Sequence, residues 1–139
     1  MLSQHGANND TPQTVLVVDN LADVRGLINV LLTRRGYRVA EADGGEQAVA
    51  EARRLVPDLI LMDLKMPGGM DGVAAAQAIR GDVGLRRVPI VAVTADNTEY
   101  WKHKAREAGF SDYLIKPFEV GELEGVLERL LPGKNSALH

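Results

Sequence analysis

The chain has 139 residues, of which 45% are hydrophobic and 25% charged, so its length and composition fit one compact domain with a core of its own. The net charge of −3 and the scattered basic residues give no sign of a nucleic-acid-binding patch, and the lack of cysteine excludes disulfides, thiol nucleophiles and thiolate metal sites. No apolar run approaches the roughly 20 residues of a membrane span, so we expect a cytoplasmic protein without membrane attachment.

Short apolar runs alternate along the chain with segments of helical spacing. The runs, the second of which is weaker and more polar, predict strands at residues 15–18, 37–40, 59–62, 90–93 and 113–115. Between them, apolar residues recur every three or four positions, which is typical of amphipathic helices. Gly36 and Gly109 lie where helices are expected to end, and Pro57 and Pro89 lie just before strands.

These five strand-then-helix units predict an α/β domain with a doubly wound, five-stranded parallel sheet and five helices, since parallel strands need right-handed crossovers. The weak second strand suits an edge, which favours the flavodoxin-like strand order 2-1-3-4-5. We expect the domain to span residues 14–131, after a disordered polar leader at 1–13 and before a short C-terminal tail at 132–139. In such sheets, ligands bind beyond the carboxyl ends of the strands.

Four polar residues stand at those carboxyl ends: Asp19, Asp63, Thr94 and Lys116 follow the first, third, fourth and fifth strands. Each has an ordinary explanation by itself, such as capping a helix or starting a turn. Together they would meet at one edge, where two close carboxylates need a cation between them, and oxygen ligands favour Mg²⁺. A threonine hydroxyl and a lysine ammonium beside the ion suit a phosphoryl group, which a carboxylate can itself accept as a nucleophile.

The strand-end residues occur within the segments "VLVVDN", "PDLILMDLKMPGGMDG", "PIVAVTA" and "DYLIKPF". A strand-end Asp followed by "KMP", a later "VTA" and a final "KPF" resembles the receiver domains of two-component response regulators. The resemblance covers the chain from about Val15 to Leu131. It implies a signalling switch rather than a turnover enzyme, although such a domain helps to catalyse its own phosphorylation and dephosphorylation.

Residue by residue, the resemblance implies that Asp63 is the phospho-acceptor and that Mg²⁺ is bound by Asp19, Asn20, Asp63 and the backbone carbonyl of Lys65. Asp19 and Asn20 match the family's acidic pair, but Asn20 offers an amide oxygen without a negative charge. Because ligand charge tunes affinity, we expect weaker Mg²⁺ binding than a full acidic pair gives.

The resemblance also implies a switch. Thr94 would turn towards the phosphoryl group, Lys116 would pair with it, and the rotamer of Tyr113 would follow Thr94. Phosphorylation adds about −1.5 to −2 charge and three acceptor oxygens, to which Lys116 and Thr94 could donate hydrogen bonds. The Lys116–Pro117 bond is expected to be cis in this family.

A pair of glycines after Asp63 and a pair of aromatic residues in the fourth helix carry further predictions. Paired glycines at Gly68 and Gly69, where the family commonly has one residue, predict either a looser loop after the acceptor or a neutral insertion. Tyr100 and Trp101 are neighbours near the start of the fourth helix, so they point about 100° apart and one of them should be partly exposed.

The partners implied are a histidine kinase or histidine phosphotransfer protein as donor, and a downstream protein at the face made by the fourth helix, fifth strand and fifth helix. Tyr100 or Trp101 could anchor that contact, and phosphorylation could drive dimerisation there. We expect a stand-alone receiver. Alternatives are a pseudo-receiver that binds proteins without phosphotransfer and a receiver excised from a larger hybrid protein. A flavin-binding enzyme is least favoured, because no phosphate-cradling loop follows the first strand.

Overall fold

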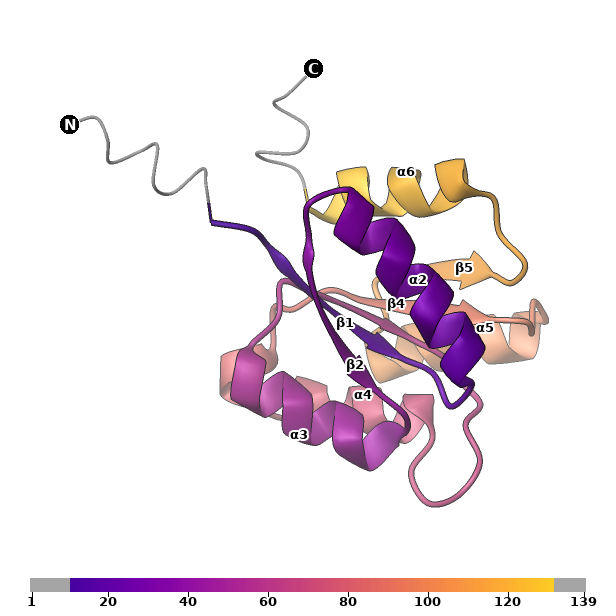
Figure 1. Ribbon diagram of the computed structural model, residues 1–139. Helices are drawn as coiled ribbons and strands as arrows, with labels where there is room; N and C mark the ends of the chain where they lie inside the picture. Colours follow the sequence, from indigo (N-terminus) through magenta and orange to yellow (C-terminus); the bar gives the residue numbers. More distant parts are fainter. Residues whose placement is uncertain (1–10, 132–139) are drawn as a thin grey trace.

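Five strand-and-helix units make up residues 11–131, the part of the chain that the computed structural model describes (Figure 1). In chain order the elements are β1 (Thr14–Val18), α2 (Ala22–Arg34), β2 (Arg38–Ala42), α3 (Gly45–Leu55), β3 (Leu59–Met62), α4 (Gly72–Arg80), the 3₁₀ helix η1 (Val83–Leu85), β4 (Ile90–Thr94), α5 (Glu99–Ala108), β5 (Asp112–Ile115) and α6 (Val120–Leu130). Residues 1–10 of the predicted leader and the predicted tail at 132–139 lie outside the described residues.

The strands form one parallel sheet in the order β2-β1-β3-β4-β5, which confirms the predicted fold. The central strands β1, β3 and β4 are almost wholly buried, as expected for a sheet covered on both faces. The edge strand β2 runs two residues further than predicted, because its pairing with β1 continues to Val18 and Ala42. It also begins one residue later, since the Tyr37 N–H bonds to the Leu32 carbonyl and closes the end of α2.

Helices cover both faces of the sheet (Figure 1). Alternate strand residues point to opposite faces, so Val15 and Val17 join one buried cluster and Leu16 and Val18 join another. The first cluster contains the buried residues of α2 and α6, and the second contains those of α3, α4 and α5. Two helices therefore pack on one face of the sheet and three on the other.

The predicted helix stops are confirmed at Gly36 and Gly109, which have φ values of +92° and +98° that favour glycine. At the other end of α5, the Thr98 side chain accepts the Trp101 N–H as an N-cap. Within the described residues, no helix is both long enough and apolar enough to cross a membrane.

Candidate functional site

The polar residues at the strand ends meet at one open hollow on the carboxyl edge of the sheet. Asp19, Asp63 and Lys116 directly follow β1, β3 and β5, and Thr94 is the last residue of β4. The hollow has a volume of about 450 Å³ and is lined by Asn20, Leu21, Asp63, Lys65, Pro67, Thr94, Ala95, Asp96 and Lys116. The predicted site residues therefore line this hollow, apart from Asp19, which lies behind it and contacts Lys116, and Tyr113, which bonds to the lining residue Asp96.

Lys116 lies between the two carboxylates. Its Nζ donates to Asp19 Oδ2 at 3.0 Å and to Asp63 Oδ2 at 3.1 Å. The Asp19 side chain is only 2% exposed and that of Asp63 10%. Burial alone would lower the pKa of Lys116, but the hydrogen bonds to Asp19 and Asp63 outweigh it and the pKa is raised. The Lys116 ammonium thus partly neutralises a pair of nearly buried carboxylates.

Backbone contacts fix the two carboxylates at the strand ends. The Asp19 N–H continues the sheet by bonding to the Ala42 carbonyl, and the Asp63 N–H bonds to the Val18 carbonyl. The Asp19 side chain also accepts the Leu21 N–H at 2.9 Å through Oδ1, which orients it within the turn. On the far side of Asp63, Gly72 at the start of α4 packs against the Asp63 carbonyl so closely that a Cβ would overlap it.

An ion pair that sequence reasoning missed supports the turn after β1. Arg25 donates through Nη1 to the Asp19 carbonyl at 2.7 Å and through Nε to Glu41 at 2.9 Å. Hydrogen bonds from Asn29 and Arg25 lower the pKa of Glu41, which keeps this carboxylate charged. Arg25 and Glu41 come from a helix and a strand 16 residues apart, so no local pattern in the sequence signals their contact.

The oxygen atoms of the site fit Mg²⁺. Asp19 and Asp63 already share one cation, the Lys116 ammonium, so both can face a single positive centre. The exposed Asn20 beside them adds an amide oxygen rather than a third acid, and within residues 11–131 no three His, Cys, Asp or Glu side chains form a metal-binding group. An oxygen-only donor set with two charges suits a hard divalent cation.

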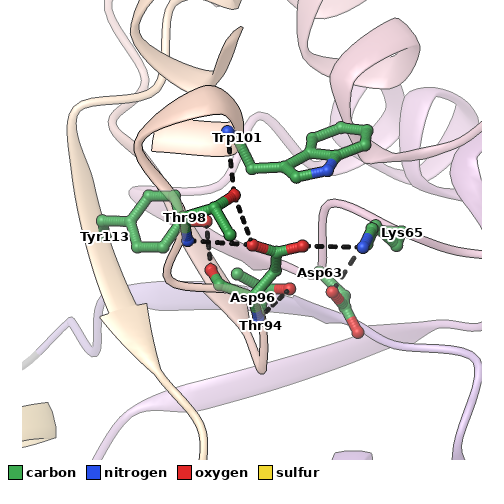
Figure 2. Close-up of polar contacts among 7 residues, drawn as sticks. All are labelled: Asp63, Lys65, Thr94, Asp96, Thr98, Trp101 and Tyr113. Carbon is green, nitrogen blue, oxygen red and sulfur yellow. Dashed lines mark hydrogen bonds and ion pairs between the residues drawn. The ribbon is translucent and has the colours of Figure 1, made fainter. Parts of the chain in front are cut away.

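The Lys65 side chain makes contacts that the sequence did not reveal (Figure 2). Its Nζ pairs with Asp96 Oδ2 at 2.7 Å and lies 5.1 Å from the centre of the Trp101 ring. Asp96 Oδ1 accepts both the N–H and the hydroxyl of Thr98. Hydrogen bonds from Lys65 and Thr98 lower the pKa of Asp96 to about 2. The sequence "DNT" before a helix could have predicted the Asp96–Thr98 contacts, since an Asp side chain often bonds to the residue two positions later in a turn.

Tyr113 is attached to the same loop. Its hydroxyl donates to the Asp96 carbonyl at 2.5 Å, and burial, with the charges of Asp96 and Asp63, raises its pKa to about 12. Thr94 is 2% exposed, and its hydroxyl accepts the Asp96 N–H at 3.4 Å. Thr94 and Tyr113 thus contact the backbone of one residue, Asp96, from two sides. The Lys116–Pro117 bond is cis, as the resemblance implies.

The loop after Asp63 has both paired glycines in the left-handed region, with φ of +77° at Gly68 and +62° at Gly69. It is tied to α3, because the Met70 N–H donates to Glu46 at 3.1 Å. Of the aromatic pair, Tyr100 is 63% exposed and Trp101 is half-buried, which confirms that both cannot face the core.

Comparison with known proteins defines the class of this site. The model of the response regulator receiver domain matches residues 15–128, so the chain belongs to the receiver domain family. It is 42% identical over 120 residues to the signal transduction histidine-protein kinase BarA of Shigella flexneri and 37% identical over 129 residues to the phosphate regulon transcriptional regulatory protein PhoB of Pseudomonas aeruginosa.

These relatives are longer proteins. The matches cover 86% and 90% of this chain, but 13% of BarA and 56% of PhoB. The fold is shared with Vibrio cholerae chemotaxis protein CheY4, at a TM-score of 0.83 and 30% identity over 87% of this chain and 100% of that one. The receiver domain of sensor histidine kinase PA1611 from Pseudomonas aeruginosa PAO1, solved with a magnesium ion in its active site cleft, has a TM-score of 0.80 and 38% identity over 86% of this chain and 98% of its own.

Proposed function

We propose that this chain accepts a phosphoryl group on Asp63 from the phosphohistidine of a histidine kinase or histidine phosphotransfer protein, and that phosphorylation switches its contacts with other proteins. The observation that most supports this function is the Lys116 ammonium, which contacts Asp19 and Asp63 together at an open hollow. A nearly buried carboxylate beside a fixed cation is prepared to act as a nucleophile towards an anionic phosphoryl group.

In the transfer, one carboxylate oxygen of Asp63 forms a bond to phosphorus while the N–P bond of the donor histidine breaks. The electron pair of that bond stays on the imidazole nitrogen. Lys116 neutralises charge on the phosphoryl oxygens, and Thr94 donates its hydroxyl to one of them. Asp19, Asp63, the Asn20 amide oxygen and the Lys65 carbonyl would hold Mg²⁺, which supplies further positive charge to the same oxygens.

Movement of Thr94 towards the phosphoryl group would withdraw its hydroxyl from the Asp96 N–H. The Asp96 carbonyl also accepts the Tyr113 hydroxyl, and Asp96 lies in the loop that leads into α5. The change at the site would therefore reach Tyr113 and the start of α5. The downstream partner would then bind the face made by α5, β5 and α6, where the exposed Tyr100 and the half-buried Trp101 are candidate anchors. A phosphorylation-linked dimer through this face and a cytoplasmic location stay predictions.

A protein donor is supported by the surface next to the hollow. An apolar groove of about 470 Å³ shares Ala95 and Lys116 with the hollow and is otherwise lined by Val24, Leu27, Ile28, Leu31, Pro117, Phe118 and Val120. Leu27 is 61% exposed there, so contact with a partner would remove this apolar surface from water.

Asn20 favours a second candidate function, a pseudo-receiver that binds proteins without phosphotransfer. The two candidates are separated by incubating the chain with acetyl phosphate and Mg²⁺ and measuring its intact mass. A working receiver gains the mass of one phosphoryl group, loses this gain when EDTA replaces Mg²⁺, and shows none in Asp63→Asn. No gain in the wild type would favour the pseudo-receiver.

A further inference from the structure

The Lys65 side chain lies at the hollow with a charge that the proposed transfer does not use. It follows Asp63 by two residues, lines the same hollow and is 51% exposed. Its ammonium is paired with Asp96, which follows the neighbouring strand β4, and the Trp101 ring lies next to it (Figure 2). The site therefore has two lysines, of which only Lys116 contacts Asp63 through its side chain.

We propose that the Lys65 ammonium is a second cationic ligand of the phosphoryl group and that Asp96 holds it in reserve until Asp63 is phosphorylated. The inference rests on the proposed function, because it concerns the state that phosphorylation creates.

The charges favour an exchange of partners. Phosphorylation adds about −1.5 to −2 charge at Asp63, compared with the single charge of Asp96. Lys116 already contacts Asp63 Oδ2, whereas, among the described residues, Asp63 Oδ1 accepts only the backbone N–H of Lys65, at 3.3 Å. The Lys65 ammonium ends a flexible four-carbon chain, so rotation of the side chain would turn it from Asp96 towards the new anion.

The exchange would leave Asp96 without its cation while its bonds to Thr98 persist. The Asp96 carbonyl accepts the Tyr113 hydroxyl and Thr98 caps α5, so release of Lys65 would remove the side-chain tie between the loop after β3 and the segment that leads into α5. Lys65 and Asp96 would thus act as a latch between the acceptor loop and the partner face.

Titration calorimetry with beryllofluoride, which mimics a phosphoryl group on a carboxylate, tests the exchange in the presence of Mg²⁺. Lys65→Gln should bind it about tenfold more weakly, which is the loss expected for one charge-assisted hydrogen bond at an exposed site. Lys65→Arg should restore binding. Asp96→Asn should bind several-fold more tightly, since the competing anion is gone while the amide oxygen can still accept from Thr98. Arg54→Gln, which breaks an exposed ion pair of the same 2.7 Å length on α3, should change nothing.

Opposite signs for Lys65→Gln and Asp96→Asn support the latch, because a purely structural ion pair would weaken binding from either side. Equal affinity of Lys65→Gln and the wild type, or weaker binding by Asp96→Asn, would overturn it. A wild type that binds beryllofluoride but fails these comparisons contradicts only the latch. A wild type that neither binds beryllofluoride nor gains mass from acetyl phosphate contradicts the proposed function and the latch with it.

Discussion

At the scale of single residues, charge balance governs the site. Asp19 and Asp63 together carry two negative charges in nearly buried positions, and Lys116 returns one positive charge to both of them. Asn20 adds none. A divalent cation would therefore meet two carboxylates and one lysine, and its affinity should depend on the residue at position 20.

Substitution of Asn20 by Asp should tighten Mg²⁺ binding, because each added ligand charge favours a hard cation. Asn20→Ala should weaken it, since the amide oxygen is lost. Calorimetric titration of Mg²⁺ into the three proteins would therefore rank the affinities Asp above Asn above Ala. Unchanged or weaker binding in Asn20→Asp would show that Asn20 does not face the ion.

The raised pKa of Tyr113 should make the free energy of unfolding depend on pH. Burial, with the charges of Asp96 and Asp63, raises the pKa of its phenol to about 12 in the folded protein, compared with about 10 in an unfolded chain. Between these values the folded state holds a proton that the unfolded state has lost, so the free energy of unfolding falls as pH rises through this window. Below about pH 10 Tyr113 causes no such change.

Urea unfolding at several alkaline pH values would check this. We expect the wild type to lose stability more steeply above pH 10 than Tyr113→Phe, which cannot ionise. Parallel slopes for the two proteins would mean that Tyr113 titrates normally.

At the scale of elements, the packing of α4 against the end of β3 positions Asp63. A methyl group at Gly72 would overlap the Asp63 carbonyl oxygen and crowd the Leu64 Cα, both of which are backbone atoms. Gly72→Ala should therefore lower the free energy of unfolding by about 3 kcal/mol, at the upper end of overpacking costs. It should also slow phosphorylation of Asp63.

Gly26 offers the matched control, because it lies within α2 and a Cβ there would meet nothing within 4 Å. Gly26→Ala should raise stability by about 0.5 to 1 kcal/mol through helix propensity alone. Urea denaturation of both variants tests the contrast, and a Gly72→Ala protein as stable as the wild type would contradict the close approach.

Arg80 joins elements on the same face of the sheet. Its guanidinium donates through Nη2 to the Gly109 carbonyl at 2.8 Å and through Nη1 to the Val88 carbonyl at 2.6 Å. Burial lowers its pKa. The end of α4 is thereby fastened to the end of α5 and to the segment that enters β4.

The fold could be predicted from sequence wherever burial dominates. The runs at β1, β3 and β4 are apolar because both faces of these strands are covered, and their cores were predicted correctly. The edge strand β2 was less predictable. Its Glu41 looks unsuited to a strand, but Arg25 and Asn29 satisfy its charge across the sheet edge.

At the scale of the whole molecule, a parallel sheet gathers strand ends that are far apart in sequence. Asp19 and Lys116 are 97 residues apart and yet share a hydrogen bond. Because this convergence follows from topology, the residues of the site could be predicted to meet once the strand order was predicted. The contacts of side chains that join two loops could not be predicted in this way. Lys65 was assigned only a backbone role and Asp96 none, since nothing local marks a lysine that reaches a different loop.

Chemical trapping at residue level tests most directly whether Asp63 carries the phosphoryl group. Borohydride reduces an aspartyl phosphate to homoserine, which peptide sequencing by mass spectrometry can locate. After treatment with acetyl phosphate and Mg²⁺, homoserine should stand at position 63 of the wild type and at no other position, and Asp63→Asn should show none. Homoserine elsewhere, or its absence from a wild type that has gained a phosphoryl group, would contradict the account.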